Sequence, residues 1–227
     1  MVDSYSVVLL IAGKGARCNL PLNKVFYELQ NKALFTYSLD VFLEDTRCKR
    51  IIIVHSKEDV DLVTKYLSCY HDERITTTFG GKERQNSVLN GLEKVETEYV
   101  LVHDGARANI NRLLIDNLLE GFNESLAVSL GIKVSDTIKA VTEKVQTVDR
   151  SNLYYMQTPQ GAKTDVLKTC LKLACDKNVI VTDDLMAIEL FSNIVPKIVL
   201  GDKTNIKVTT IEDIDLLKFY MEKLCIE

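Results

Sequence analysis

Apolar runs and stretches with helical spacing alternate along the first half of the chain. The strand-like runs cover residues 7–12, 50–55, 75–79 and 99–103, and each is followed by a helix-like stretch, at 33–43, 59–70, 83–95 and 113–122. This alternation is typical of βαβ crossovers and of a mostly parallel sheet covered by helices on both faces. Because such sheets bind ligands beyond the carboxyl ends of their strands, we expect the site in the loops that follow the strands.

The pattern changes after Ser125. Residues 126–134 predict another strand, and residues 137–141 and 144–148 predict two short strands around a turn at Thr142 and Glu143, which together resemble a hairpin arm. Helix-like stretches then return at 165–175 and 184–191, a strand at 197–200, and a final helix that Thr210 and Asp213 can cap. No linker or repeat interrupts the chain, so we expect one α/β domain over residues 1–227 with an arm at 136–158.

Charge and hydropathy restrict the classes of partner. The 227 residues carry a formal net charge of −4, which gives no general attraction to nucleic acid or to anionic membranes. The first residues lack the basic and apolar regions of a signal peptide, and no apolar run approaches the roughly 18 residues of a membrane span. We therefore expect a cytoplasmic protein that binds any polyanion through a local cluster of basic residues.

Cysteine and histidine are placed unfavourably for metal or acyl-transfer chemistry. The six cysteines form no CxxC pair, the three histidines are far apart in sequence, and no GxSxG motif is present. This argues against a zinc site, a disulfide framework and a Ser-His-Asp triad. We expect reduced thiols.

The loop after the first strand gathers positive charge around two glycines. It contains Gly13, Gly15, Arg17 and Lys24, with Cys18 at the third position of a GxGxxG pattern, and it does not match a Walker A motif. Such a loop can bring backbone amides to phosphates while lysine and arginine add full charges. A solvated basic loop is the alternative that this stretch alone leaves open.

Two further loops carry polar residues at strand ends. Gly80 and Gly81 end one strand, and Arg84 lies in the first turn of the following helix, an arrangement that suits a base or phosphate bound by backbone amides or that forms a simple tight turn. Asp104 ends the next strand, with Arg107 close behind it. The pair suits a cation and a phosphate, or it forms an internal ion pair.

Together these stretches resemble the cytidylyltransferases of the isoprenoid pathway that begins from methylerythritol. The matching motifs extend over nearly the whole chain and occur in the order AGKGAR, NK, GGKERQNSV, VLVHDGAR, DT, TVDR, QTPQ, TDD and NIKVT. The resemblance implies a Rossmann-like nucleotidyltransferase fold whose β-arm is exchanged in a homodimer. It also implies that CTP and methylerythritol phosphate are the substrates and that Mg²⁺ is the cofactor.

The resemblance also implies roles for particular residues. Arg17, Lys24 and Lys207 are expected to face the triphosphate as catalytic residues. Asp104 is expected near the metal as well as near both substrates. The nucleotide-binding set is Ile11, Ala12, Gly13, Gly15, Gly81, Lys82, Arg84, Ser87 and Asp104, and the acceptor-binding set is Asp104, Arg107, Thr137, Arg150, Thr158 and Thr182, of which Thr137 and Arg150 come from the partner subunit.

The reaction that is implied suits these residue types. A phosphate monoester that attacks the α-phosphorus of CTP needs no covalent nucleophile from the protein. It needs alignment of two anions and neutralisation of their charge, which lysine, arginine and a divalent cation supply.

Three alternatives remain open at this point. A ribitol 5-phosphate cytidylyltransferase shares several of the motifs, and Arg150 in TVDR favours methylerythritol phosphate. A non-catalytic nucleotide-binding module predicts a missing basic residue, but Lys24 and Lys207 are present. A metal-dependent glycosyltransferase needs an acidic pair after a strand, and the pair Asp183-Asp184 has the pattern of a helix start instead.

Overall fold

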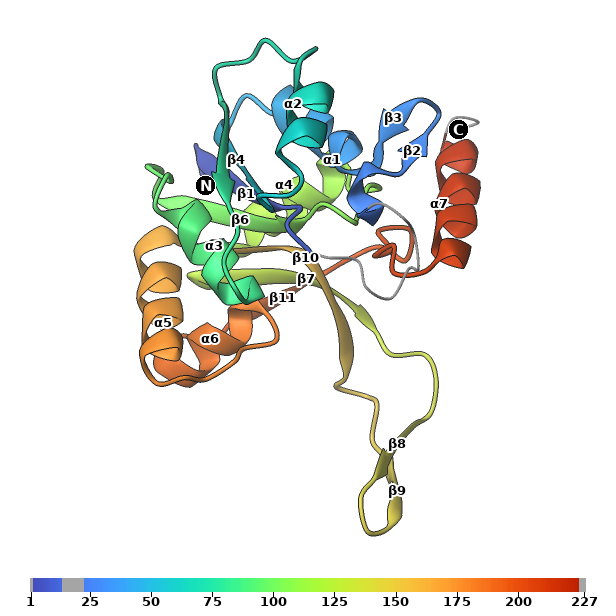
Figure 1. Ribbon diagram of the computed structural model, residues 1–227. Helices are drawn as coiled ribbons and strands as arrows, with labels where there is room; N and C mark the ends of the chain where they lie inside the picture. The colour runs from blue at the N-terminus through green and yellow to red at the C-terminus, as the bar shows by residue number, and fades with distance from the viewer. Residues whose placement is uncertain (1, 14–22, 225–227) are drawn as a thin grey trace.

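A seven-stranded sheet with helices on both faces forms the body of the protein (Figure 1). The computed structural model describes residues 2–13 and 23–224. The strand order is β11-β7-β10-β6-β1-β4-β5, and every neighbouring pair is parallel except the two that include β10. The predicted fold class, a mostly parallel sheet flanked by helices, is therefore confirmed. The strands of this sheet are β1 (Tyr5–Leu10), β4 (Cys48–His55), β5 (Ile75–Phe79), β6 (Tyr99–Asp104), β7 (Ala127–Lys133), β10 (Tyr154–Lys163) and β11 (Lys197–Leu200).

The helices follow the predicted positions closely. The boundaries of α6, β5 and β11 agree with the prediction, and the other predicted elements differ by a few residues at their ends. The helices are α1 (Leu34–Glu44), α2 (Val60–Leu67), α3 (Arg84–Leu92), α4 (Arg112–Gly121), α5 (Thr164–Asp176), α6 (Asp184–Phe191) and α7 (Ile211–Leu224), and a short 3₁₀ helix, η1, covers Lys24–Phe26.

Side chains of the central strands alternate between two apolar layers. In β1, Val7 and Leu9 belong to a cluster with residues of α1, α2 and α4, whereas Val8 packs with residues of α3, α5 and α6. In β4, Ile53 faces the first layer and Ile52 the second. Because helices cover both faces, these strands are apolar at successive positions, which explains their strong signal in the sequence.

The sequence pattern did not predict strand β10, although this strand lies in the interior of the sheet. It runs antiparallel between β6 and β7. Its central residues, Gln157, Thr158, Pro159 and Gln160, do not form an apolar run, yet the three polar side chains are almost completely buried. They are stabilised by hydrogen bonds to distant segments, which a local sequence pattern does not report.

The predicted arm is present as a hairpin that projects from the body (Figure 1). It consists of β8 (Ile138–Val141) and β9 (Val145–Val148), which pair only with each other. The expected range 136–158 also takes in Tyr154, where β10 begins and pairs with β7.

The segment after β11 returns to the carboxyl ends of the strands. The amide of Val208 donates to the carbonyl of Ala106 at 2.9 Å, which places Lys207 beside the end of β6. The Asp213 carboxylate accepts hydrogen bonds from the amides of Thr209 and Thr210 at 2.7 and 2.8 Å, so the predicted cap of α7 is confirmed. Helix α7 then packs with Leu29 of a small hairpin, β2 (Glu28–Leu29) and β3 (Lys32–Ala33), and with Leu34 at the start of α1, through Leu217.

The described part of the chain was also searched for membrane spans. None of its helices combines the length and the apolar character that crossing a membrane requires.

Candidate functional site

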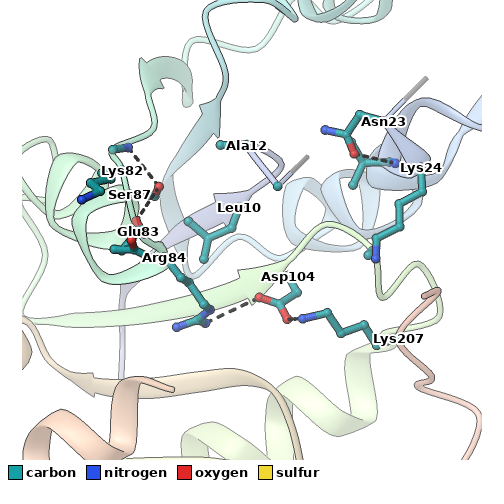
Figure 2. A pocket seen from close by; sticks show the side chains of 14 residues that line it. Leu10, Ala12, Asn23, Lys24, Lys82, Glu83, Arg84, Ser87, Asp104 and Lys207 are labelled. Atoms are coloured by element: carbon teal, nitrogen blue, oxygen red, sulfur yellow. Dashed lines mark hydrogen bonds and ion pairs between the residues drawn. The ribbon is translucent and has the colours of Figure 1, made fainter. Parts of the chain in front are cut away.

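A cavity of about 470 Å³ opens at the edge of the sheet where β1 and β6 end (Figure 2). The loops that follow these strands are held side by side. The amide of Gly105 donates to the carbonyl of Leu10 at 2.9 Å, and a side chain at Gly105 would place its Cβ 2.5 Å from Ile11 Cγ2. The residues that line the cavity are Leu10, Ala12, Gly13, Asn23, Lys24, Val25, Gly81, Lys82, Glu83, Arg84, Ser87, Asp104, Ala106 and Lys207.

Asp104 lies between two cationic side chains in this cavity (Figure 2). Its Oδ2 is 2.6 Å from Lys207 Nζ, and its Oδ1 is 3.5 Å from Arg84 Nη2. Burial opposes ionisation of Asp104, but Arg84 and Lys207 outweigh it and hold the pKa of the carboxyl well below its ordinary value. The sequence left open an internal ion pair between Asp104 and Arg107. Among the described residues, the ion-pair partners of Asp104 are instead Arg84 and Lys207 of the cavity wall.

A buried hydrogen-bonded chain supports Asp104 from below. The amide of Asp104 donates to Thr158 Oγ1 at 3.0 Å, Thr158 Oγ1 lies 3.1 Å from His103 Nδ1, and His103 Nε2 lies 3.1 Å from the carbonyl of Arg107. Burial lowers the pKa of His103 to about 4, so the ring is neutral at pH 7. Thr158 is therefore placed beneath the cavity, and its expected contact with the acceptor stays a prediction.

Arg107 points into the protein. Its guanidinium donates to the carbonyls of Asn205 at 2.8 Å and Met156 at 3.3 Å, and burial lowers its pKa. The side chain thus connects β10 to the segment that carries Lys207. Arg107 does not line the cavity, and its expected role in binding the acceptor stays a prediction.

The Gly80-Gly81 turn is closed by the helix that follows it. The amide of Gly81 donates to Ser87 Oγ at 3.0 Å, and Ser87 Oγ donates to the carbonyl of Glu83 at 3.2 Å. A Cβ at Gly81 would come within 2.3 Å of Asn86 Cβ, so only glycine fits there without a shift. The predicted nucleotide-binding residues Gly81, Lys82, Arg84 and Ser87 all line the cavity.

The first loop contributes Ala12 and Gly13 to the cavity wall. The expected site residues Gly15 and Arg17 lie outside the described residues. Ile11 does not line the cavity, because its side chain is buried in the core and its amide donates to the carbonyl of Val54 at 2.8 Å. Its expected role in nucleotide binding stays a prediction. Leu10 supplies the apolar side chain at this position.

Asn23 is a cavity residue that was missed. Its Nδ2 donates to the carbonyl of Ile11 at 2.9 Å, and its Oδ1 accepts from the amide of Val25 at 3.4 Å, so it joins the first loop to η1, which begins at Lys24. Asn23 is part of the NK motif that carried the resemblance, but only Lys24 of that motif was assigned a role. The other cavity residues that were missed are Leu10, Val25, Glu83 and Ala106.

Thr137, Arg150 and Thr182 are not brought to the cavity that the described residues form. Thr137 precedes β8 and Arg150 follows β9, both exposed, and the Arg150 guanidinium donates to the carbonyl of Ser135. Thr182 is exposed before α6. Their expected roles stay predictions.

The acidic pair before α6 is occupied by structural contacts. Asp183 is the N-cap of α6, with Oδ1 accepting from the amide of Met186 at 2.9 Å, and it also accepts from Gln160. Asp184 forms an ion pair with Arg84. These contacts match the expected helix start and disfavour a glycosyltransferase metal site.

Residues 2–13 and 23–224 contain no cluster of three or more metal-ligating side chains. Asp104 is the only aspartate in the described wall of the cavity. This donor set fits Mg²⁺, which is commonly bound through one or two carboxylates together with substrate phosphates.

The open α/β sheet, with a glycine turn, a carboxylate and basic side chains around a cavity at its carboxyl edge, is typical of enzymes that bind nucleotides. The comparison with protein families specifies the class further. Residues 5–223 match the model of the 2-C-methyl-D-erythritol 4-phosphate cytidylyltransferase family, and the chain belongs to this family.

Curated relatives carry the same name. The 2-C-methyl-D-erythritol 4-phosphate cytidylyltransferase of Clostridioides difficile is 35% identical over 217 residues, which cover 93% of this chain and 91% of the relative. The protein of that name from Alkaliphilus metalliredigens is 39% identical over 221 residues, with 94% and 91% covered.

Solved structures agree with this assignment. The crystal structure of 4-diphosphocytidyl-2C-methyl-D-erythritol synthase from Anaerococcus prevotii is similar, with a TM-score of 0.87 and 28% identity over 98% of this chain and 100% of that one. The cytidylyltransferase from Francisella tularensis gives a TM-score of 0.81 at 28% identity, with 95% and 99% covered.

Proposed function

We propose that this chain transfers the cytidylyl group of CTP to 2-C-methyl-D-erythritol 4-phosphate, giving 4-diphosphocytidyl-2-C-methyl-D-erythritol and pyrophosphate. Membership of the family supports the choice of substrates. The observation that carries the proposal in this chain is the array of Lys207, Asp104 and Arg84, held together in one cavity.

The proposed reaction is an in-line displacement at phosphorus. An oxygen of the acceptor phosphate forms a bond to the α-phosphorus of CTP, and the bond from that phosphorus to the bridging oxygen of the β-phosphate breaks, so pyrophosphate leaves with the electron pair. The described residues assigned to charge neutralisation are Lys24, Lys207 and Arg84, which screen the repulsion between the two anions and stabilise the charge of the transition state. Ala12, Gly81 and Ser87 are assigned to the nucleoside.

The proposal includes Mg²⁺ as cofactor. Asp104 would hold it, with the remaining ligands from substrate phosphates and water, and the ion would neutralise the charge of the triphosphate. Asp104 is held ionised by Arg84 and Lys207, which supports this assignment.

A homodimer also belongs to the proposal. The arm of one subunit would carry Thr137 and Arg150 to the acceptor site of the other. Two apolar arm residues, Val141 and Val145, are 73% and 67% exposed in the single chain, as expected for a surface that a second subunit covers. The cytoplasmic location expected above stays a prediction.

Release of pyrophosphate tests the function. The purified protein is given CTP and Mg²⁺, with 2-C-methyl-D-erythritol 4-phosphate in one reaction and ribitol 5-phosphate in a parallel one. We expect release with the first acceptor. If pyrophosphate is released only with ribitol 5-phosphate, the proposed acceptor is wrong and ribitol 5-phosphate takes its place. If neither acceptor gives pyrophosphate although the protein binds CTP, the result would favour a non-catalytic nucleotide-binding module.

A further inference from the structure

Arg84 has a second acidic partner, which lies behind the cavity wall. This partner is Asp184, the first residue of α6. The Arg84 guanidinium donates two hydrogen bonds to its carboxylate, from Nη1 to Oδ1 at 3.0 Å and from Nη2 to Oδ2 at 2.8 Å. The Asp184 side chain is 3% exposed and that of Arg84 is 27% exposed. The two residues are 100 positions apart in the sequence. The reaction as described above uses Arg84 and leaves this buried carboxylate without a role.

The position of Asp184 is rigidly determined. Its amide donates to Gln160 Oε1 at 2.9 Å, which attaches the first turn of α6 to β10. Gln85, next to Arg84 in α3, accepts from the amide of Val181 at 2.9 Å and donates to the carbonyl of Val179 at 3.0 Å. The start of α3 is thus hydrogen-bonded to the segment just before α6, and the first turn of α6 is hydrogen-bonded to β10, so Asp184 is an anchor for the guanidinium.

This anchor limits how closely the Arg84 guanidinium approaches Asp104. A guanidinium that donates both parallel hydrogen bonds to one carboxylate has a fixed orientation. Arg84 Nη2 remains 3.5 Å from Asp104, whereas Lys207 reaches the same carboxylate at 2.6 Å. Without the Asp184 carboxylate, Asp104 would remain as an ion-pair partner of Arg84 in the described cavity wall. The guanidinium would then be expected to move towards Asp104 and form direct hydrogen bonds with it.

We propose that Asp184 is a positioning residue: it holds Arg84 in the cavity wall, aimed at the nucleotide phosphates, and keeps its guanidinium from closing to hydrogen-bond distance on Asp104. The inference rests on the proposed function, because it assigns Arg84 to the nucleotide. Burial raises the pKa of Asp184 although Arg84 opposes this, which agrees with a carboxylate that depends on this one arginine for its charge.

Calorimetric binding of CTP, without acceptor, tests the proposal through Asp184→Asn. We expect the Kd for CTP to rise about tenfold, with a fall in kcat. The sign is diagnostic, because removal of a negative charge near a triphosphate would by itself tighten binding. Asp183→Asn is the matched control: it makes the same substitution one residue earlier and keeps a cap acceptor for α6. It gives up the hydrogen bond from Gln160 to Oδ2 but leaves both hydrogen bonds between Arg84 and Asp184 in place, so Kd should change by less than about twofold.

A double-mutant cycle separates positioning from a structural effect of α6. In the Arg84→Gln background, Asp184→Asn should leave Kd for CTP unchanged, since the group through which it acts is gone. An equal rise in both backgrounds, or tighter binding by Asp184→Asn, would overturn the proposal. If Asp184→Asn does not fold, Arg84→Lys provides the second variant, because it keeps both charges and breaks the paired hydrogen bonds; Kd equal to that of the wild type would then refute the idea.

The two proposals fail in distinguishable ways. CTP binding and its response to Asp184→Asn do not depend on the acceptor. Wild-type protein that releases no pyrophosphate with either polyol phosphate, but whose CTP affinity follows the expected cycle, would overturn the proposed function and leave the role of Asp184 standing.

Discussion

Individual residues of this site are stabilised by chains of contacts that extend well below the cavity. Asp104 is held at its carboxylate by Lys207 and Arg84 and at its amide by Thr158, which in turn contacts His103. A neutral His103 with one accepting and one donating nitrogen fits both of its neighbours. The protonation state of a single buried ring therefore contributes to the stability of the segment that carries Asp104.

His103 should make the free energy of unfolding depend on pH. In the unfolded chain a histidine takes up a proton near its ordinary pKa of about 6.5, whereas in the folded protein burial lowers the pKa to about 4. The unfolded state thus binds more protons in this window, so stability is complete above pH 6.5 and is lost as the pH falls towards 4, by about 3 kcal/mol from this residue.

Urea denaturation of His103→Gln at several pH values between 7 and 4 checks this. We expect the variant to show a smaller slope of stability against pH in that window than the wild type. His71→Gln, which replaces an exposed histidine, should keep the wild-type slope. A wild-type slope in His103→Gln would show that other groups cause the acid sensitivity.

At the residue scale, the sequence indicated which side chains stand at the ends of the strands but not what they contact. The motifs placed Gly81, Asp104 and Lys207 in the site, and all three line the cavity. Arg107, in the same motif as Asp104, instead donates to buried carbonyls. Two neighbours in a motif can point to opposite sides of a loop, and a motif does not report which one faces the cavity.

Secondary-structure elements explain where prediction succeeded. Strands β1 and β4 are covered by helices on both faces and have continuous apolar runs, while amphipathic helices such as α4 show the spacing of one buried face. The central part of strand β10 is equally buried but carries polar side chains, so its sequence lacks that pattern. The prediction failed where burial is stabilised by hydrogen bonds from other elements.

Close packing of helix α3 against β1 should limit the size of the residue that fits at Gly91. Alanine at Gly91 would favour a helix by about 1 kcal/mol, but its Cβ would come 2.6 Å from Val8 Cγ1. Overpacking a tight contact costs about 1–3 kcal/mol, which exceeds the gain in helix propensity by up to about 2 kcal/mol. We therefore expect Gly91→Ala to lower the free energy of unfolding by up to about 2 kcal/mol.

The same substitution in a Val8→Ala background identifies the cause. Removal of the Val8 methyl groups opens the space, so Gly91→Ala should there be neutral or stabilising, as helix propensity alone predicts. Chemical denaturation of the four proteins gives the coupling. An equal loss in both backgrounds would mean that contact with Val8 is not the reason for glycine.

The whole molecule is divided into a compact body and a projecting arm (Figure 1). The body contains the cavity, whereas the arm pairs with no other strand and exposes apolar side chains. Val141 and Val145 pair across the hairpin, so their side chains lie on one face of it. This arrangement is costly for a monomer in water and is the physical argument for the proposed dimer.

The double variant Val141→Lys/Val145→Lys tests the arm. We expect it to dissociate the dimer, because charged side chains replace the apolar contact, and to lower kcat/KM by at least about tenfold, since Thr137 and Arg150 would no longer reach the other subunit. Light scattering after size-exclusion chromatography gives the mass. Val195→Lys, at an 81% exposed valine outside the arm, should stay dimeric and active. A wild-type protein that is monomeric and active would contradict the exchange.

The sequence by itself determined most of the elements, though not β10, and the edge of the sheet at which the site lies. Local spacing of apolar residues specifies which face of a helix or strand is buried, and glycines and charges at strand ends follow from that order. Only the tertiary structure decided that β10 enters the sheet between β6 and β7, that Lys207 meets Asp104 and that Asp184 pairs with Arg84. The two ion pairs join residues about 100 positions apart, and strand β10 pairs with strands that other elements separate from it in the sequence. The free energy of these contacts depends on the packing of the whole sheet, which no local pattern contains.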